Sequence, residues 1–321
     1  MLTEIDAGPV LEAVLDGTFP VWNDGLSRKA YSQWNLAQLK TRWGKANLQR
    51  VGLVDGDTVL ASAKRYLFDA IVAGEVVRIL GIGAVFTPDA HRGRGLAARL
   101  IDAMLADGRE RGCRWALLFS EIGPDYYARL GFTAVERADV TLTVPRSRRG
   151  APATLVRALD PADLPELAAI SQRNVESADG RLVRSADLLE FGIVRQRLRA
   201  GLGPDGLRQV EAFVSEEGHK PVSYVVVTRG PEGVRLVDCG DRDPTGARVG
   251  AMLEVLAERD PASEDRTLVG WLPPGMRPPQ LAYGDLVPTS DVMMWKPLLP
   301  DLPACPVASV PDLHWRPIDV F

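Results

Sequence analysis

The chain has no apolar segment of the roughly 18–20 residues needed to cross a bilayer. Among its 321 residues are only three cysteines and three histidines, and neither type recurs at the spacing of a metal site. Thiols so few and scattered exclude a disulfide framework and favour a reducing compartment. The first residues also carry no basic stretch followed by an apolar one, so no secretory signal is expected there. These features predict a cytoplasmic protein that binds neither a membrane nor a metal.

Positive charge is not in excess either. The formal net charge at pH 7 is -4, which argues against nucleic-acid binding through a broad basic surface. Apolar residues make up 46% of the chain and charged residues 25%, as in ordinary globular proteins. The length accommodates two domains.

The first half of the chain is predicted to be a mixed α+β domain. Residues 10–47 are compatible with helices, and three β-branched segments separated by turns then predict an antiparallel meander that ends near residue 86. Apolar residues recur at helical spacing over residues 93–111, and the apolar run 115–119 suits a central strand. The helical region holds four aromatic residues, Trp22, Tyr31, Trp34 and Trp43. We expect them to lie in the apolar core, and the alternative is that they line the acceptor pocket.

A second domain is expected after a proline- and arginine-rich break. We predict a first domain at residues 1–145, a linker at 146–152, a second domain at 153–298 and a proline-rich tail at 299–321. The order of strands and helices repeats weakly after the linker, as architecture rather than as sequence. Trp315 and Phe321 predict that the tail docks on a domain surface rather than moving freely.

The segment 92–97 has the properties of a pyrophosphate site at the start of a helix. A helix N-terminus presents unpaired N–H groups and the positive end of the helix dipole. Glycines let phosphate oxygens approach the backbone, arginines add charge, and a small residue keeps the first turn narrow. The alternative is a glycine-rich turn with incidental arginines. The segment reads Arg92-Gly93-Arg94-Gly95-Leu96-Ala97.

A dinucleotide-binding fold is a more specific alternative to the pyrophosphate site, because Gly93-x-Gly95-x-x-Ala98 matches its sequence fingerprint and the acidic Glu121 ends the next strand. Three observations exclude it. The preceding strands read as hairpins, six residues separate strand from glycines, and no further βαβ unit follows.

Two elements together resemble the GCN5-related N-acetyltransferase superfamily. The first runs from Val85-Phe86-Thr87-Pro88 to Ala97, and the second is Tyr127-Ala128-Arg129-Leu130-Gly131-Phe132. The resemblance covers residues 48–144 and implies an α+β fold with a mainly antiparallel central sheet flanked by helices. It also implies acetyl-coenzyme A as cosubstrate. Residues 22–27, 85–88 and 120–124 are more weakly similar to the fungal lysine N6-acetyltransferases.

The second half resembles a degenerate copy of the same domain, which would make the protein a tandem. Where the first copy has its phosphate loop, the second has Asp241-Arg242-Asp243-Pro244-Thr245-Gly246. Two carboxylates at that position would repel a pyrophosphate, so we expect no coenzyme A site there.

The resemblance implies a role for each site residue. The backbone of Val85, Phe86 and Thr87 would pair with the pantetheine arm, and a bulge there would aim one N–H at the thioester oxygen. Tyr127 is the expected general acid, with Tyr126 as the alternative if the register slips. Glu121 is the candidate base, the alternatives being a surface carboxylate and a water chain. His91 is expected beside the phosphates, and Ser120 could orient the acceptor or cap a turn.

The leading interpretation is thus direct transfer of an acetyl group to the amine of a small molecule, which could be similar to lysine. This acceptor would bind between the two domains and the tryptophan-rich segment. Two alternatives stay open: a non-catalytic acyl-coenzyme A binding module, and an enzyme acting on a protein amine. The sequence leaves open the acceptor, the acyl chain length, the base and the oligomeric state.

Overall fold

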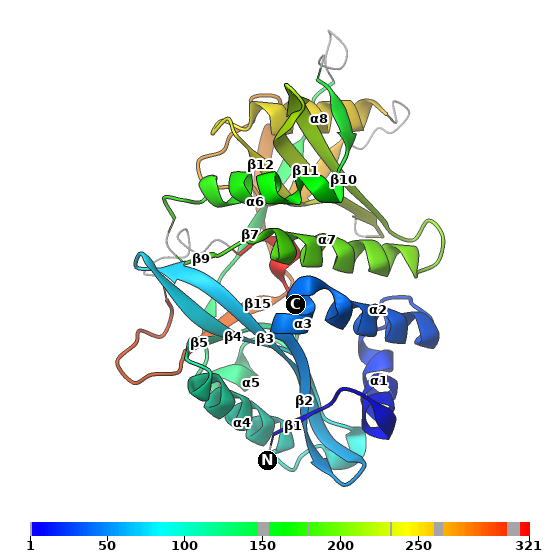
Figure 1. The fold of residues 1–321 in the computed structure, drawn as a ribbon, viewed down its shortest axis with the longest axis vertical. Coiled ribbons are helices and arrows are strands. Elements are labelled where there is room, and N and C mark those ends of the chain that lie inside the picture. Colours follow the sequence, from blue (N-terminus) through cyan, green and yellow to red (C-terminus); the bar gives the residue numbers. More distant parts are fainter. Residues whose placement is uncertain (1, 147–153, 179, 232, 260–265, 307–314) are drawn as a thin grey trace.

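The computed structural model describes residues 2–146, 154–178, 180–231, 233–259, 266–306 and 315–321. It consists of two mixed sheets stacked along the long axis of the molecule, each covered by helices (Figure 1). This confirms the predicted α+β fold with two sheets in tandem. Residues 147–152 of the predicted linker lie outside the described ranges. Within those ranges no helix is both long and apolar enough to span a membrane.

The first sheet carries eight strands in the order β1-β2-β3-β4-β5-β15-β6, with β9 paired to β3 off this path. All neighbours are antiparallel except β4 and β5, which are parallel and joined by helix α4. The strands are β1 Thr3–Glu4, β2 Leu48–Asp55, β3 Thr58–Val72, β4 Glu75–Phe86, β5 Cys113–Ser120, β6 Thr133–Val135, β9 Arg181–Leu182 and β15 Val292–Pro297.

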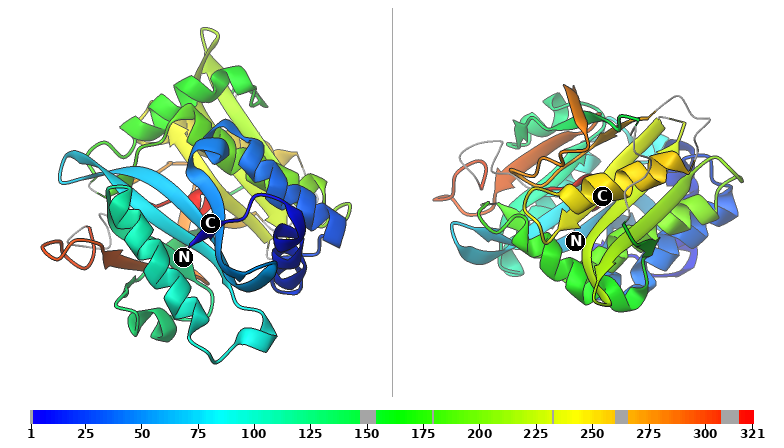
Figure 2. Two further views of the ribbon diagram at one scale, coloured as in Figure 1. Left: turned by 60° about the horizontal axis from the view of Figure 1, so that its bottom comes forward. Right: turned by 90° about the horizontal axis from the view of Figure 1, so that it is seen from above.

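Helices cover both faces of this sheet, because its side chains alternate between two apolar cores. On β3, Ala61 and Ala63 face a core that includes α4, whereas Tyr66 and Phe68 face a core that includes Trp43 of α3. The amphipathic α4 lies across the first face (Figure 2). The helices of this unit are α1 Gly8–Trp22, α2 Arg28–Lys40, α3 Arg42–Asn47, α4 Leu96–Glu110 and α5 Asp125–Ala128.

The second sheet repeats this plan. Its seven strands run in the order β14-β7-β13-β12-β11-β10-β8, and α8 joins the parallel pair β12 and β13 as α4 joins β4 and β5. The strands are β7 Ala138–Thr143, β8 Val156–Ala158, β10 Gln209–Glu217, β11 Lys220–Gly230, β12 Gly233–Asp241, β13 Thr267–Gly270 and β14 Ala282–Pro288. The helices are α6 Leu164–Arg173, α7 Ala186–Gly201 and α8 Ala247–Glu258. Helix α7 lies at the junction, against α2 and α3 of the first unit (Figure 1).

The two sheets exchange a strand. β15 of the second half lies between β5 and β6 of the first sheet, and β7 of the first half lies between β13 and β14 of the second. The sequence analysis placed each strand with its own half of the chain. The observed pairing differs because the strand pattern of a segment does not identify its partner. The expected domain limits, which stay a prediction, therefore do not coincide with the limits of the sheets.

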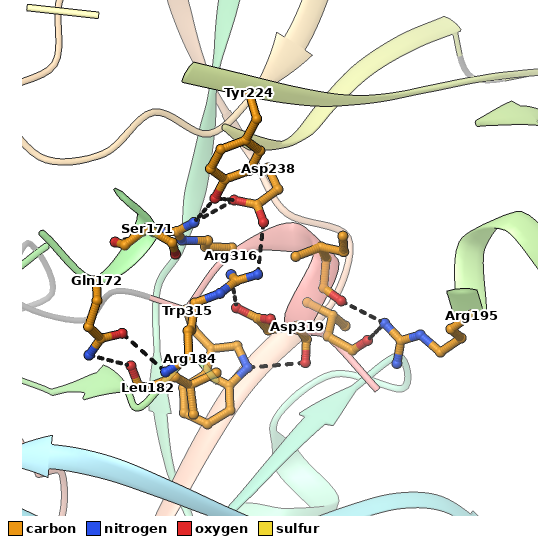
Figure 3. Close-up of polar contacts among 12 residues, drawn as sticks. Ser171, Gln172, Leu182, Arg184, Arg195, Tyr224, Asp238, Trp315, Arg316 and Asp319 are labelled. Atoms are coloured by element: carbon orange, nitrogen blue, oxygen red, sulfur yellow. Dashed lines mark hydrogen bonds and ion pairs between the residues drawn. The ribbon is translucent and has the colours of Figure 1, made fainter. Parts of the chain in front are cut away.

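The last described segment, residues 315–321, passes between the two units rather than over a surface. Trp315 is 2% exposed, and the guanidinium of Arg316 is buried against Asp238 of β12. Arg184 donates to Asp238 at 2.8 Å and to Asp319 at 2.9 Å, which closes a network of alternating charges (Figure 3). This network fixes the segment against the first sheet, where the ring of Phe321 reaches Tyr66, Phe68 and Phe119.

Candidate active site

Strands β4 and β5 separate before either of them ends. Their parallel ladder runs only to the pair Ile82 and Leu118, yet β4 continues to Phe86 and β5 to Ser120. Beyond the last pair, backbone groups on the facing edges have no partner in the neighbouring strand. Unpaired edges of this kind accept an extended ligand by adding it to the sheet.

A β-bulge occurs on β4 within this opening. Lys64 of β3 pairs with Gly83, and Ser62 pairs with Phe86, so Ala84 and Val85 together oppose one residue of β3. Ala84 has a φ of +48°, in the left-handed region that non-glycine residues rarely adopt. The bulge interrupts the ladder and turns backbone groups away from β3. The structure thus contains the bulge that the sequence could only suggest.

The loop after β4 forms an open cradle at the start of α4. Gly93 and Gly95 have φ values of +73° and +71°, and a Cβ at either would meet no atom within 4 Å. Gly95 is the N-cap of α4, and no side chain caps the helix there. The N–H groups of the first turn are therefore free for an anion. Leu96 is buried beneath them, and Ala97 is half-buried.

The loop arginines are exposed and held by short-range contacts. The guanidinium of Arg92 pairs with Asp89 at 2.8 Å and donates to the carbonyl of Thr87 at 3.2 Å. Arg94 lies 3.1 Å from the ring of His91, which places His91 beside the loop. The hydroxyl of Thr87 is buried without a hydrogen-bond partner in the described part of the chain. A ligand that runs from the strand opening to the loop would supply that partner.

Tyr127 lies in α5 and is 9% exposed, with its ring edge-on to those of Tyr126 and Phe132. Burial, followed by the charges of Tyr126 and Glu121, raises the pKa of Tyr127 to about 12. A hydroxyl with this pKa keeps its proton at neutral pH. Because it makes no hydrogen bond to any described residue, it is available to a ligand. Tyr126 is more exposed and lies against Arg129.

Glu121 follows the end of β5 and is exposed. Its carboxylate accepts a hydrogen bond of 3.0 Å from the indole of Trp22, which links the end of β5 to the end of α1. The hydroxyl of Ser120 donates to the carbonyl of Gly123 at 2.6 Å, so Ser120 caps the turn. Of the other aromatic residues, Tyr31 and Trp43 are buried in the core, and Trp34 donates to the carbonyl of Arg195.

A polar cleft of about 400 Å³ lies between the two units and the α1–α2 loop. Five arginines and three aspartates are among the residues that line it: Arg137, Arg199, Arg208, Arg229, Arg235, Asp24, Asp139 and Asp291. Sequence reasoning missed this cleft and also the buried cations Arg50, Lys64 and Arg195, the last of which donates to the carbonyl of Val320 at the cleft. The only available signal was charge at inward positions of the otherwise apolar strands β2 and β3.

The second unit places its own carboxylate where the first unit has its anion cradle. Gly246 is the N-cap of α8, with a φ of +76° like that of Gly95. Asp241 is fully buried there and accepts from the backbone N–H of Arg248 at 2.9 Å and from that of Asp243 at 2.9 Å. The helix N-terminus is thus already satisfied by an internal anion.

Comparisons with known proteins agree with this geometry. Residues 13–135 match the family described as acetyltransferase (GNAT) domain. Two GCN5-related N-acetyltransferases share the fold over most of both chains. The one from Anabaena variabilis has a TM-score of 0.65 and 14% identity, covering 93% of this chain and 73% of that one. The one from Kribbella flavida has a TM-score of 0.63 and 18% identity, covering 92% and 71%.

Eis1 from Mycobacterium abscessus is similar at a TM-score of 0.57 and 18% identity, covering 93% of this chain and 73% of that chain. No curated protein sequence matches the chain. These likenesses to solved structures show that the fold is shared. The family match covers residues 13–135, which is less than half of the chain, and shows that this part is similar to the acetyltransferase (GNAT) domain. The likeness to the fungal lysine group stays a prediction.

Within the described ranges, no group of three or more histidine, cysteine, aspartate or glutamate side chains could hold a metal ion.

Proposed function

We propose that the protein transfers an acetyl group from acetyl-coenzyme A directly to the amine of a small molecule. The observation that carries the proposal is the continuous path from the β4–β5 opening, through the bulge at Ala84 and Val85, to the anion cradle at Gly95. An extended pantetheine arm that ends in a pyrophosphate has the shape and charge of that path.

Each residue has a stated task in this proposal. The backbone of Val85, Phe86 and Thr87 pairs with the arm, and an N–H freed by the bulge stabilises the oxyanion. The loop from Arg92 to Ala97 binds the pyrophosphate. Tyr127 donates to the leaving sulfur. Glu121, at the mouth of the opening, accepts the proton of the attacking amine directly or through water.

The interdomain cleft is the proposed acceptor site. It is bounded by the α1–α2 loop through Asp24 and by Val320 of the last segment, so both units would contact the acceptor. Arginines outnumber aspartates among its lining residues, which disfavours the basic peptide expected of an enzyme that modifies protein lysines. A small molecule is therefore the better candidate, and a lysine-like amine is one member of that class.

The enzyme is distinguished from a non-catalytic binding module by thiol release. Purified protein with acetyl-coenzyme A and a panel of small amines is expected to release free thiol in proportion to acetylated amine. Tight coenzyme A binding without thiol release from any amine would favour the binding module.

A calorimetric titration tests the site. We expect one coenzyme A per chain, because Asp241 fills the corresponding position of the second unit. Reversing the charge of Arg92 and Arg94 together to glutamate should abolish binding. The matched control reverses Arg78 and Arg114, which lie at the far end of β4 and β5 in exposed pairs with Asp69 and Glu75. A second bound equivalent, or binding by the loop variant, would refute this assignment.

A cytoplasmic location remains part of the proposal. It is supported by Cys113 and Cys239, two buried cysteines that form no disulfide, as expected in a reducing compartment.

A further inference from the structure

Three cationic side chains gather on the face of the first sheet opposite α4. Arg50 of β2 and Lys64 of β3 are directly paired across the strands, and Arg195 reaches toward them from α7. They are 5%, 8% and 8% exposed. Like charges on directly opposed strand residues repel one another, and this repulsion is stronger away from water.

Within the described part of the chain, the cluster has no neutralising carboxylate. None of the three cations forms an ion pair with a described residue. Arg195 donates instead to the carbonyl of Ile318 at 2.9 Å, and Arg50 donates to the side-chain oxygen of Asn35 at 3.0 Å. Lys64 makes no hydrogen bond to a described residue, and its Nζ lies 5.2 Å from the centre of the Trp34 ring. After burial, which lowers the pKa of Arg195, the groups that oppose this effect are the phenol of Tyr66 and then Asp319, which is already paired with Arg184.

Unused hydrogen-bonding groups lie in the same place. Nη1 of Arg50 and the hydroxyl of Ser62 are buried without a partner in the described part of the chain. Ser62 and Lys64 project from the same side of β3, since side chains alternate along a strand. Buried polar groups are nearly always paired, so two unpaired ones in one region indicate a missing partner. Because the groups concerned are donors and cations, the missing partner is an anion.

The cluster borders the reaction centre. Lys64 and Ser62 pair with Gly83 and Phe86, the two residues that flank the bulge of β4. Arg195 also donates to the carbonyl of Val320, which lines the arginine-rich cleft. An anion held by the cluster would therefore lie close to the bulge and to one edge of the cleft proposed for the acceptor.

We propose that Arg50, Lys64 and Arg195 form a subsite for a carboxylate of the acceptor, so that the preferred substrates are amines that also carry a carboxylate. The inference rests on the proposed acetyl transfer and specifies its acceptor class. Bound carboxylate would satisfy the unpaired donors and relieve the repulsion between the cations. Burial and the neighbouring arginines hold the pKa of free Lys64 well below its usual range, and a bound carboxylate would raise it again.

The test uses pairs of amines that differ only in the carboxylate: lysine with 1,5-diaminopentane, and phenylalanine with 2-phenylethylamine. For at least one pair, the wild-type protein should show kcat/KM about tenfold or more higher for the acid. Lys64→Met should abolish most of that preference, and so should Arg50→Met. Arg50→Lys, which keeps the charge, should retain more of it. The control Arg78→Met removes an exposed cation of the same sheet that pairs with Asp69, and should keep the full preference.

Calorimetric titration of the same pairs makes the test independent of turnover. Selective binding of the acids that is lost in Lys64→Met supports the subsite, even if no amine in the panel is acetylated. In that case the proposed function fails and the subsite stands. Equal affinity for both members of each pair overturns the subsite, even if thiol is released. It is also overturned if Lys64→Met keeps the preference, because the carboxylate then binds elsewhere.

Discussion

Tyr127 has two properties that suit a hydrogen-bond donor to a leaving thiolate: its side chain is largely buried, and its hydroxyl makes no hydrogen bond within the described chain. A thiol has a pKa of about 8.5, so a tyrosine with a pKa of about 12 does not surrender its proton to a free thiolate. It donates a hydrogen bond that strengthens as negative charge develops on sulfur. Tyr127 is thus built to act in the transition state rather than in the ground state.

Replacing Tyr127 with phenylalanine tests this role. We expect kcat at saturating acetyl-coenzyme A to fall about 100-fold, the low end for loss of one hydrogen-bond donor to a developing anion. The KM for acetyl-coenzyme A should change little, because the loop at Gly95 is untouched. Tyr126→Phe is the matched control and should stay close to wild type. Equal effects of the two changes would mean that the ring, and not the hydroxyl of Tyr127, matters.

The pH dependence of kcat follows from the same burial. The pKa of Tyr127 is raised to about 12, so the proton is retained through the range in which a free amine becomes available. We expect kcat to show no decline from loss of this acid below about pH 11, whereas an ordinary tyrosine would lose its proton near pH 10. A decline with a midpoint near 10 that disappears in Tyr127→Phe would show that the site is more hydrated than this structure implies.

Lys64 should lower the stability of the ligand-free protein. Burial and two nearby arginines lower its pKa, so its charged form is disfavoured in the folded state. Lys64→Met should therefore raise the free energy of unfolding by about 1 kcal/mol at pH 7, measured by urea denaturation. Between the folded and unfolded pKa values the unfolded chain binds more protons, so wild-type stability rises with pH in that range. The advantage of the variant should then shrink toward pH 10.

A loss of stability in Lys64→Met would contradict this account and make Lys64 a part of the fold. The control is Lys40→Met, at the end of α2 and outside the cluster, which should change the free energy of unfolding by less than about 0.5 kcal/mol.

The loop that starts α4 could be predicted because its signal is local. Two glycines, two arginines and the following helical period lie within a few residues, and the structure places each where that pattern indicates. The exchange of β7 and β15 could not be predicted, since it depends on which distant edge each strand meets. The same holds for the cation cluster, whose members come from β2, β3 and α7 and meet only in the folded chain.

Gly95→Ala separates the conformational role of this glycine from its role in binding. Gly95 and Gly74 both have φ above +70° and open space around them, so alanine at either should cost about 1 kcal/mol of stability. Only Gly95 lies in the proposed pyrophosphate cradle. We expect Gly95→Ala to weaken coenzyme A binding about tenfold or more, by calorimetry, because a Cβ would enter the space of a phosphate oxygen. The cradle is wrongly placed if Gly74→Ala weakens binding equally.

The exchanged strands join the two units into one cooperative structure. Without β15, the first sheet would have a gap between β5 and β6, and without β7 the second would have the same gap beside β13. Neither half of the chain contains a complete sheet. We therefore expect a single unfolding transition, with tryptophan fluorescence and circular dichroism giving the same midpoint in urea. Two separated transitions would show that each unit folds without the exchanged strand.

The buried charge network ties the last segment to this structure, and Asp238 is its centre. Asp238 is fully buried and pairs with both Arg184 and Arg316 (Figure 3). Asp238→Ala would leave two buried guanidinium groups short of a partner, and should cost about 3–5 kcal/mol in the free energy of unfolding. Asp69→Ala, which breaks an exposed pair with Arg78, should cost less than about 1 kcal/mol.

Residues 315–321 also carry the carbonyl of Val320 to Arg195 and the ring of Phe321 to the first sheet. If the network holds this segment in place, Asp238→Ala should lower kcat/KM for the acceptor more than coenzyme A affinity, since Gly95 and its loop lie on other elements. Equal losses in both would mean that the network supports the fold as a whole and not the acceptor side of the site in particular.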